Sequence, residues 1–302
     1  MRFGMNEDLS ARLGKIIEAT VRLAHELKYQ YGFDPSPQSQ GAKERDSGIV
    51  AGGHRLILEA GQMAETRLVA TAGHLQALGS LLERPDQAAF GVFAISGLAR
   101  TALELSARAA WLLDPRIDGW TRGLRGMAEM LYSFSEEAKY PAPPIQESAR
   151  RRLAKYVAAA ESAGLAPAPH RDRPEHFGEP RLGATGVIKA QMGAEGELTY
   201  RELSGIAHGN ITALLRLTEN VSLDEWSDNV VPREEGISLT QPVIATHVLP
   251  LLAVVHRAYA EALEFKVRLF GWDQAFYKLR RIEIAKAMVD LMRALPGVGT
   301  DA

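Results

Sequence analysis

The stretch 90-FGVFAISGLARTALELSARAAWLLD-114 decides the fold class. Apolar residues recur along it at spacings of three and four, which is the period of an α-helix rather than that of a strand. Pro115 follows at once, and proline cannot continue a helix because it lacks the backbone N–H. The pattern predicts a helix over Gln87–Leu113 that is apolar on most of its sides and therefore central to a core.

The same helical period fills most of the remaining chain, and alternating β-branched runs are almost absent. The sequence therefore predicts an all-α protein, a single multi-helix bundle of about eight helices. A polar loop is expected over 34–46, and an irregular stretch with room for a hairpin over 220–240. The expected helices cover residues 7–31, 48–82, 87–113, 118–139, 145–163, 199–217, 242–270 and 273–295.

Domain organisation depends on the segment 164-GLAPAPHRDRPEHFGEPRLG-183, which is dense in proline and glycine. Such composition is typical of a loop or a boundary. Helical periodicity continues on both sides, and neither side alone shows a complete set of caps and core faces. We therefore expect one helical domain over 1–302, with 164–183 as an exposed loop.

The apolar content and the charge balance of the sequence limit which macromolecules or membranes the protein can be expected to bind. With 46% apolar residues the chain can build a large core, and 35 Lys and Arg against 37 Asp and Glu give no overall field that favours DNA or an anionic membrane. No membrane and no DNA partner is predicted, and any RNA contact has to be local. The apolar run 243–255 contains Pro250 and is shorter than the roughly 20 residues of a membrane span.

Other chemistry is excluded by missing residues and motifs. The chain has no cysteine, which removes disulfides and thiolate sites and fits a cytoplasmic protein. Neither phosphate-loop glycine motif is present, nor the His and Glu spacings of common helical metal sites, so no cofactor and no metal is expected. We interpret His170, Asp172 and His176 as a solvated loop. The richness in Ala, Gly and Arg is typical of a bacterial protein.

Arg100 and Glu104 form the first polar group of interest, because they lie four residues apart on the most apolar helix. A charge buried there needs a partner, since an unpaired buried charge costs several kcal/mol. The sequence predicts a buried Arg100–Glu104 salt bridge. Its role is open between a structural pair that joins helices and an anion site in which Glu104 holds Arg100 toward a phosphate.

The second polar group is 200-YRELSGIAHGN-210. On a helix Arg201, Ser204 and His208 share one stripe, while Leu203 and Ile206 lie on the opposite one. Histidine can act as general acid or base near neutral pH, and arginine can neutralise phosphodiester oxygens. Ser204 and Asn210 could position a phosphate through hydrogen bonds.

The spacing in 201-RELSGIAH-208 resembles the Arg-x6-His motif of the HEPN superfamily, the higher eukaryote and prokaryote nucleotide-binding domains. That resemblance implies an all-α, commonly dimeric, metal-independent endoribonuclease of toxin and defence systems, with Arg201 as phosphate clamp and His208 as acid and base. Glu202 departs from the small polar residue that often follows the arginine. The chain is also similar to uncharacterised bacterial helical proteins that combine 100-RTALE-104 with 200-YRELSGIAH-208.

Three functions follow as hypotheses. The first is a non-catalytic HEPN-like helical protein in which these polar residues form an internal network that binds a nucleotide or RNA. Its alternative is the endoribonuclease, acting through Arg201 and His208, with a homodimer expected. The third is a small-molecule enzyme or sensor whose pocket is lined by Trp111, Tyr200 and His208. The residues assigned to substrate binding are Tyr200, Ser204, Asn210, Arg100 and Glu104.

Overall fold

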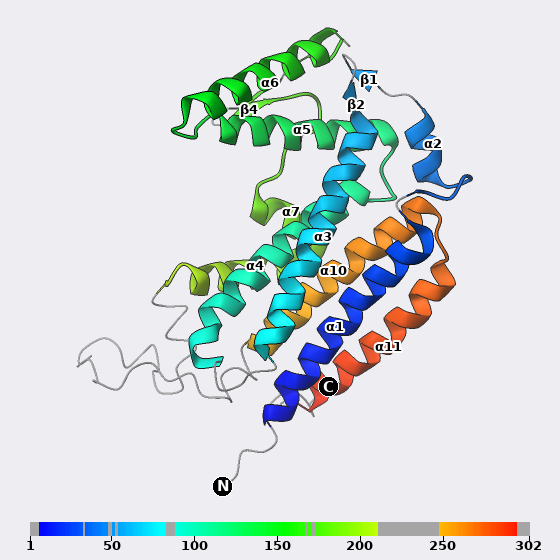
Figure 1. The fold of residues 1–302 in the computed structure, drawn as a ribbon, viewed down its shortest axis with the longest axis vertical. Coiled ribbons are helices and arrows are strands. Elements are labelled where there is room, and N and C mark those ends of the chain that lie inside the picture. Colours follow the sequence, from blue (N-terminus) through cyan, green and yellow to red (C-terminus); the bar gives the residue numbers. More distant parts are fainter. Residues whose placement is uncertain are drawn as a thin grey trace, which may run out of the picture.

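The computed structural model describes residues 6–32, 34–47, 50–51, 54–82, 88–162, 164–166, 168–170, 173–210 and 248–294. Within these ranges it has nine α-helices and two short antiparallel strand pairs (Figure 1), which confirms the all-α class. The helices are α1 (Asn6–Tyr31), α2 (Gln40–Asp46), α3 (Leu56–Leu82), α4 (Ala88–Leu113), α5 (Gly119–Glu137), α6 (Pro143–Ser162), α7 (Ala184–Ala207), α10 (Leu249–Phe270) and α11 (Gln274–Arg293). The strands are β1 (Val50–Ala51), β2 (His54–Arg55), β3 (Ala168–His170) and β4 (Arg173–His176).

Helix α4, the stretch that predicted the fold class, lies at the centre and packs against α3, α7 and α10. Its buried alanines, among them Ala99 and Ala102, let these neighbours approach closely. Helices α1 and α11 extend the main core on the side of α10. A second, smaller apolar cluster lies where α5 and α6 cross one end of α3, which Figure 1 shows at the top. Its residues are Leu56, Leu124, Met127, Leu131, Phe134, Tyr156, Ala160 and Phe177.

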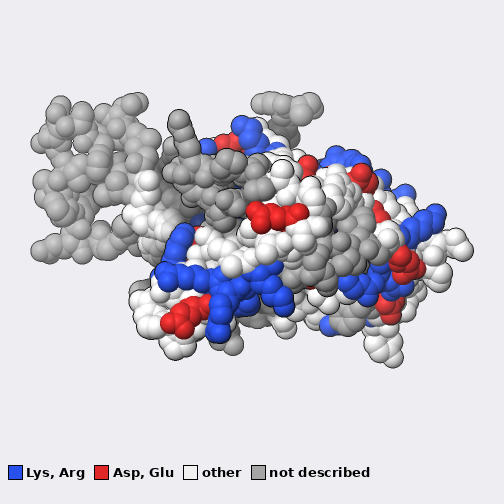
Figure 2. Space-filling model, turned by 90° about the horizontal axis from the view of Figure 1, so that it is seen from above, with Lys and Arg blue, Asp and Glu red and all other residues white. Residues whose placement is uncertain are grey.

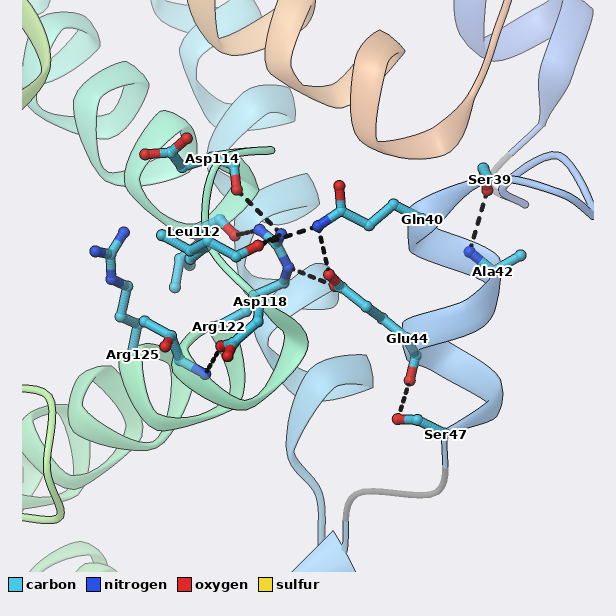
Figure 3. A network of polar contacts seen from close by, with 12 residues as sticks. Ser39, Gln40, Ala42, Glu44, Ser47, Leu112, Asp114, Asp118, Arg122 and Arg125 are labelled. Atoms are coloured by element: carbon cyan, nitrogen blue, oxygen red, sulfur yellow. Dashed lines mark hydrogen bonds and ion pairs between the residues drawn. The ribbon is translucent and has the colours of Figure 1, made fainter.

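Two arginines of α5 contact the end of α4, and Figure 3 shows the contacts of one of them, Arg122. The last carbonyls of a helix have no partner within the helix, so side-chain donors stabilise them. Arg125 donates to the Trp111 carbonyl at 2.8 Å, and Arg122 donates to the carbonyl of Asp114 at 3.0 Å and to that of Leu112. Arg122 also pairs with Glu44 of α2 at 2.8 Å. One buried side chain therefore fixes α2, α4 and α5 together.

The predicted loop over 34–46 was wrong in its second half, where α2 forms. The Ser39 hydroxyl caps this helix by accepting a hydrogen bond from the Ala42 amide at 3.1 Å. Gly41 lies so close to the end of α10 that a β-carbon would stand 3.1 Å from the Leu269 carbonyl oxygen. Tertiary packing therefore supports a helix too short to form alone. The next helix begins at Leu56 rather than at residue 48, after the β1–β2 pair.

Helix α7 begins at Ala184, earlier than the predicted residue 199, and bends at Gly193, whose φ is 68°. It ends after Ala207. The Gly209 amide then donates to the Ile206 carbonyl and the Asn210 amide to that of Gly205, which is a Schellman end. Gly209, with a φ of 67°, therefore serves the end of the helix. The predicted continuation to 217 and the hairpin region 220–240 lie outside the described residues.

Segment 164–183 carries the β3–β4 pair and also reaches into the interior. Phe177 is buried in the second apolar cluster, and Arg181 lies beside α5. The single domain over 1–302 stays a prediction. No helix within the described ranges combines the length and the apolar character needed to cross a bilayer.

Candidate functional site

Three residues predicted from two separate sequence motifs meet where α4 packs on α7. Arg100 Nη2 donates to the Tyr200 hydroxyl at 3.1 Å, and that hydroxyl donates to Glu104 Oε2 at 3.4 Å. The Arg100 guanidinium also lies over the Tyr200 ring, 5.3 Å from its centroid. Tyr200 is buried, so it works as a bridge inside the protein rather than as a surface group.

The predicted direct salt bridge between Arg100 and Glu104 was wrong. Glu104 forms its ion pair with Arg108 instead, at 3.0 Å, and Arg100 reaches Glu104 through Tyr200. Orientation explains the difference, because helical side chains lean toward the N-terminus. An acidic residue therefore pairs better with a base four positions later than with one four positions earlier.

Arg108 leads from this pair into a larger buried cluster. Its Nη1 contacts Glu129 Oε1 of α5 at 2.8 Å, and it also donates to the Leu182 carbonyl at 3.3 Å. Arg67 of α3 binds the other Glu129 oxygen at 2.6 Å, and Arg181 lies 3.3 Å from Oε1. We call the whole set the arginine cluster: Arg67, Arg100, Arg108, Arg181, Glu104, Glu129 and Tyr200.

The arginine cluster holds more positive than negative charge: three guanidinium groups contact its two carboxylates, and Arg100 adds a fourth that reaches Glu104 through Tyr200. Burial lowers the pKa of Arg67, and repulsion from the Arg108 and Arg181 charges adds to this while Glu129 opposes it. Burial likewise lowers the pKa of Arg181. Arg67 Nη1 and Arg100 Nε are buried and find no hydrogen-bond acceptor among the described residues. The cluster therefore has an excess of charge and unused donors.

The arginine cluster is shielded without being sealed. The side chains of Glu104, Arg67 and Arg181 remain 27%, 16% and 14% exposed. The Arg181 guanidinium stacks on the Tyr132 ring, 3.4 Å from its centroid. Stacking of this kind fixes the plane of a guanidinium, which favours two-pronged binding of an oxyanion.

Four members of the arginine cluster escaped the sequence analysis. Arg108 had a usable signal, because 100-RTALELSAR-108 continues the four-residue spacing beyond Glu104. Glu129 stands among apolar positions of a strongly amphipathic helix, where a carboxylate is unexpected. Arg67 and Arg181 carry no local signal, since they meet at Glu129 only because α3 and the segment before α7 both pack against α5.

The residues predicted to be catalytic lie elsewhere, on the surface of α7. Arg201 is 65% exposed and pairs with Glu197 at 2.9 Å, and Lys189 binds the same carboxylate at 3.0 Å. These hydrogen bonds, first that of Lys189 and then that of Arg201, lower the pKa of Glu197. His208 is also exposed and follows the last helical turn. The charge of Arg201 is therefore partly neutralised where a phosphate would bind.

The remaining predicted residues flank this surface. Ser204 is half-buried and Asn210 is exposed, while Leu203 and Ile206 are buried, as the helical wheel predicted. The side chains of His170, Asp172 and His176 lie outside what the structure describes. Among the described side chains no group of three potential metal ligands comes together.

A basic surface lies on α6. Figure 2 shows Lys and Arg side chains gathered on this face of the molecule. Arg150, Arg151 and Lys155 are exposed there, and Arg152 pairs with Glu137 while lying over the Phe134 ring. Balanced overall charge thus coexists with a local concentration of positive charge, which can attract a polyanion.

No protein-family model, curated protein or solved structure matches this chain.

Proposed function

We propose that this chain is a non-catalytic helical binding protein of HEPN-like type whose arginine cluster binds the phosphate of a nucleotide or of an RNA end. One observation carries the proposal: the cluster combines four guanidinium groups with two carboxylates, and two buried guanidinium nitrogens have no acceptor among the described residues. Arginine is the side chain best shaped for two-pronged contacts with phosphate oxygens.

Charge balance supports phosphate as the ligand. Leaving a buried charge without compensation costs about 3–5 kcal/mol. A phosphate monoester carries a charge of about −1.5 to −2 and several strong acceptor oxygens, which matches an excess of two guanidinium groups. The partly exposed side chains of Arg67 and Arg181 give it a way in. The basic face of α6 supports attraction of a longer polyanion toward the protein.

Calorimetric titration tests whether the arginine cluster binds phosphate. The ligands are inorganic phosphate, AMP and a short RNA with and without a 5′-phosphate. We expect the phosphorylated ligands to bind and to raise the melting temperature, because a bound ligand stabilises the folded state. Arg67→Gln and Arg100→Gln should weaken binding about tenfold or more, since each removes charge-assisted hydrogen bonds.

Arg22→Gln is the matched control, because it removes an exposed arginine of α1 that pairs with Glu18 and belongs to neither candidate site. Its affinity should equal that of the wild type. Equal losses in all three variants would contradict a specific site at the cluster, and absence of phosphate binding would overturn the proposal.

The endoribonuclease remains a second candidate, because Arg201 and His208 are both exposed and open to a large substrate. In that case His208→Ala should lower RNA cleavage about 10²–10⁴-fold, and added chelator should change nothing. Glu197→Gln should raise cleavage, since it removes the carboxylate that pairs with Arg201. Cleavage that survives His208→Ala would eliminate this candidate, and the mass of the purified protein would show whether a homodimer accompanies it.

A further inference from the structure

A cavity of about 620 Å³ lies between α2, α3 and α10, away from the residues of the arginine cluster. It is also distinct from the pocket expected around Trp111, Tyr200 and His208. Its volume falls within the range of roughly 300–1,000 Å³ that is usual for small-molecule sites. Its apolar walls come from Pro35, Ile57, Leu58, Leu113, Leu269 and Phe270.

Each charged side chain that lines the cavity has an ion-pair partner of opposite charge, and Arg45 has a second one in Asp46, at 3.3 Å. Lys266 contacts Glu65, Arg122 contacts Glu44 at 2.8 Å, and Arg45 contacts Asp34 at 3.1 Å. Arg122 is further occupied by the carbonyl groups at the end of α4 (Figure 3). The lining therefore offers no uncompensated charge, which is the opposite of the arginine cluster. A neutral ligand fits this balance better than an ion does.

Lys266 lines the cavity and has hydrogen-bonding capacity to spare. Its side chain is 7% exposed and lies over the aromatic rings of Trp272, at 4.9 Å, and Phe270, at 5.7 Å. An ammonium carries three N–H donors, and among the described residues Lys266 uses one, toward Glu65. Burial lowers its pKa, against the opposing effect of Glu65. An acceptor oxygen of a ligand would satisfy a remaining donor.

Gly61 gives the cavity a wall of bare backbone. It lies within α3, where glycine stabilises a helix less than alanine does. A β-carbon at Gly61 would meet nothing within 4 Å, so packing inside the protein does not require glycine there. Gly126 of α5 shows the contrast, because its β-carbon would stand 2.7 Å from that of Ala60. The space beside Gly61 suits the flat face of a ligand.

We propose that this cavity binds an uncharged small molecule with a flat apolar body and a carbonyl-type oxygen that accepts a hydrogen bond from Lys266. The apolar body lies against Gly61 and the surrounding aliphatic side chains. Neutrality follows from the paired charges, and the carbonyl from the free donors of Lys266.

The probe for this proposal is 6-propionyl-2-(dimethylamino)naphthalene, an uncharged fluorescent ketone whose emission shifts to the blue in an apolar site. We expect saturable binding to the wild type. Gly61→Leu should weaken it at least tenfold, because the added side chain occupies space that lines the cavity, where a β-carbon meets no protein atom within 4 Å. Gly73→Leu is the matched control: Gly73 lies on the same helix, is exposed, has equal room for a β-carbon and does not line the cavity.

Circular dichroism of both variants checks that they remain folded, so that a loss of binding reports on the cavity. The anionic dye 1-anilinonaphthalene-8-sulfonate tests neutrality and should bind more weakly than the ketone. Equal affinity of the wild type and Gly61→Leu for the ketone, or no binding to the wild type, would overturn the proposal. Tighter binding of the anionic dye would overturn the assignment of an uncharged ligand.

Discussion

His256 is a buried histidine on α10 whose protonation is linked to stability. Its Nε2 lies 2.6 Å from the Thr20 hydroxyl, which itself donates to the Ile16 carbonyl at 3.0 Å. A hydroxyl has one proton to donate, so this arrangement assigns the proton of the imidazole to Nε2. Burial first, and then the positive charge of Arg281, lower the pKa of His256 from 6.5 to about 4.

The pH dependence of stability follows from this shift. The unfolded chain takes up a proton on His256 below pH 6.5, whereas the folded protein does so only below about pH 4. The stabilisation is therefore fully present above pH 6.5 and is lost as the pH falls toward 4, by about 3 kcal/mol in total. His256→Gln keeps a donor toward Thr20 but cannot titrate. We expect urea unfolding to show a steeper loss of stability for the wild type than for the variant over this window; parallel curves would contradict the assignment.

For single residues, the sequence predicted which side chains are buried better than it predicted which charged side chains pair. The buried face of Leu203 and Ile206 follows from helical periodicity alone, and the structure has it so. Glu104 had two arginines within reach, and the choice of Arg108 depends on side-chain direction. Tyr200 joined Arg100 for a reason that lies outside the sequence of either helix, namely the packing of α7 on α4.

Among the elements, α2 depends most on its surroundings. It has seven residues, far fewer than the roughly 12–15 that an isolated helix needs for marginal stability. The Ser39 cap therefore stabilises a helix that has little intrinsic helical stability. Ser39→Ala should lower the free energy of unfolding by about 1 kcal/mol, the usual cost of losing a cap.

Chemical denaturation of Ser39→Ala and of Ser80→Ala tests this expectation. Ser80 is exposed on α3 and bonds to the Gln76 carbonyl within its own helix, so its loss should cost no more than about 0.5 kcal/mol. Equal stability of the two variants would show that packing alone holds α2.

Helices with a strong apolar period were predicted closely, as α4 and α5 show, whereas α2 and the first half of α7 were missed. The segment 184–198 contains Gly186, Gly193 and Gly196, which weaken a helical signal. Its helix forms because Val187 and Ile188 are buried in the main core. Tertiary contacts thus supply what local propensity lacks there.

For the whole molecule, periodicity predicts the class but not the arrangement. The crossing of α5 and α6 over one end of α3 depends on contacts between distant parts of the chain, such as that of Arg67 with Glu129. In the sequence alone, a residue such as Arg67 cannot be distinguished from an ordinary surface charge. The arginine cluster forms only where four helices, α3, α4, α5 and α7, and the segment before α7 come together.

Helix α3 belongs to both apolar clusters, since Leu56 packs in the smaller one and Ala60 in the main one. No flexible joint separates these positions, because the helix runs through both without interruption. If α5 and α6 moved away from α3, Leu56 in the first turn of α3 would lose its apolar contacts. The ion pair between Glu129 of α5 and Arg67, further along α3, would break as well. The two layers are therefore coupled mechanically, and hydrogen exchange in α5 should track exchange in α3 as parts of one cooperative unit.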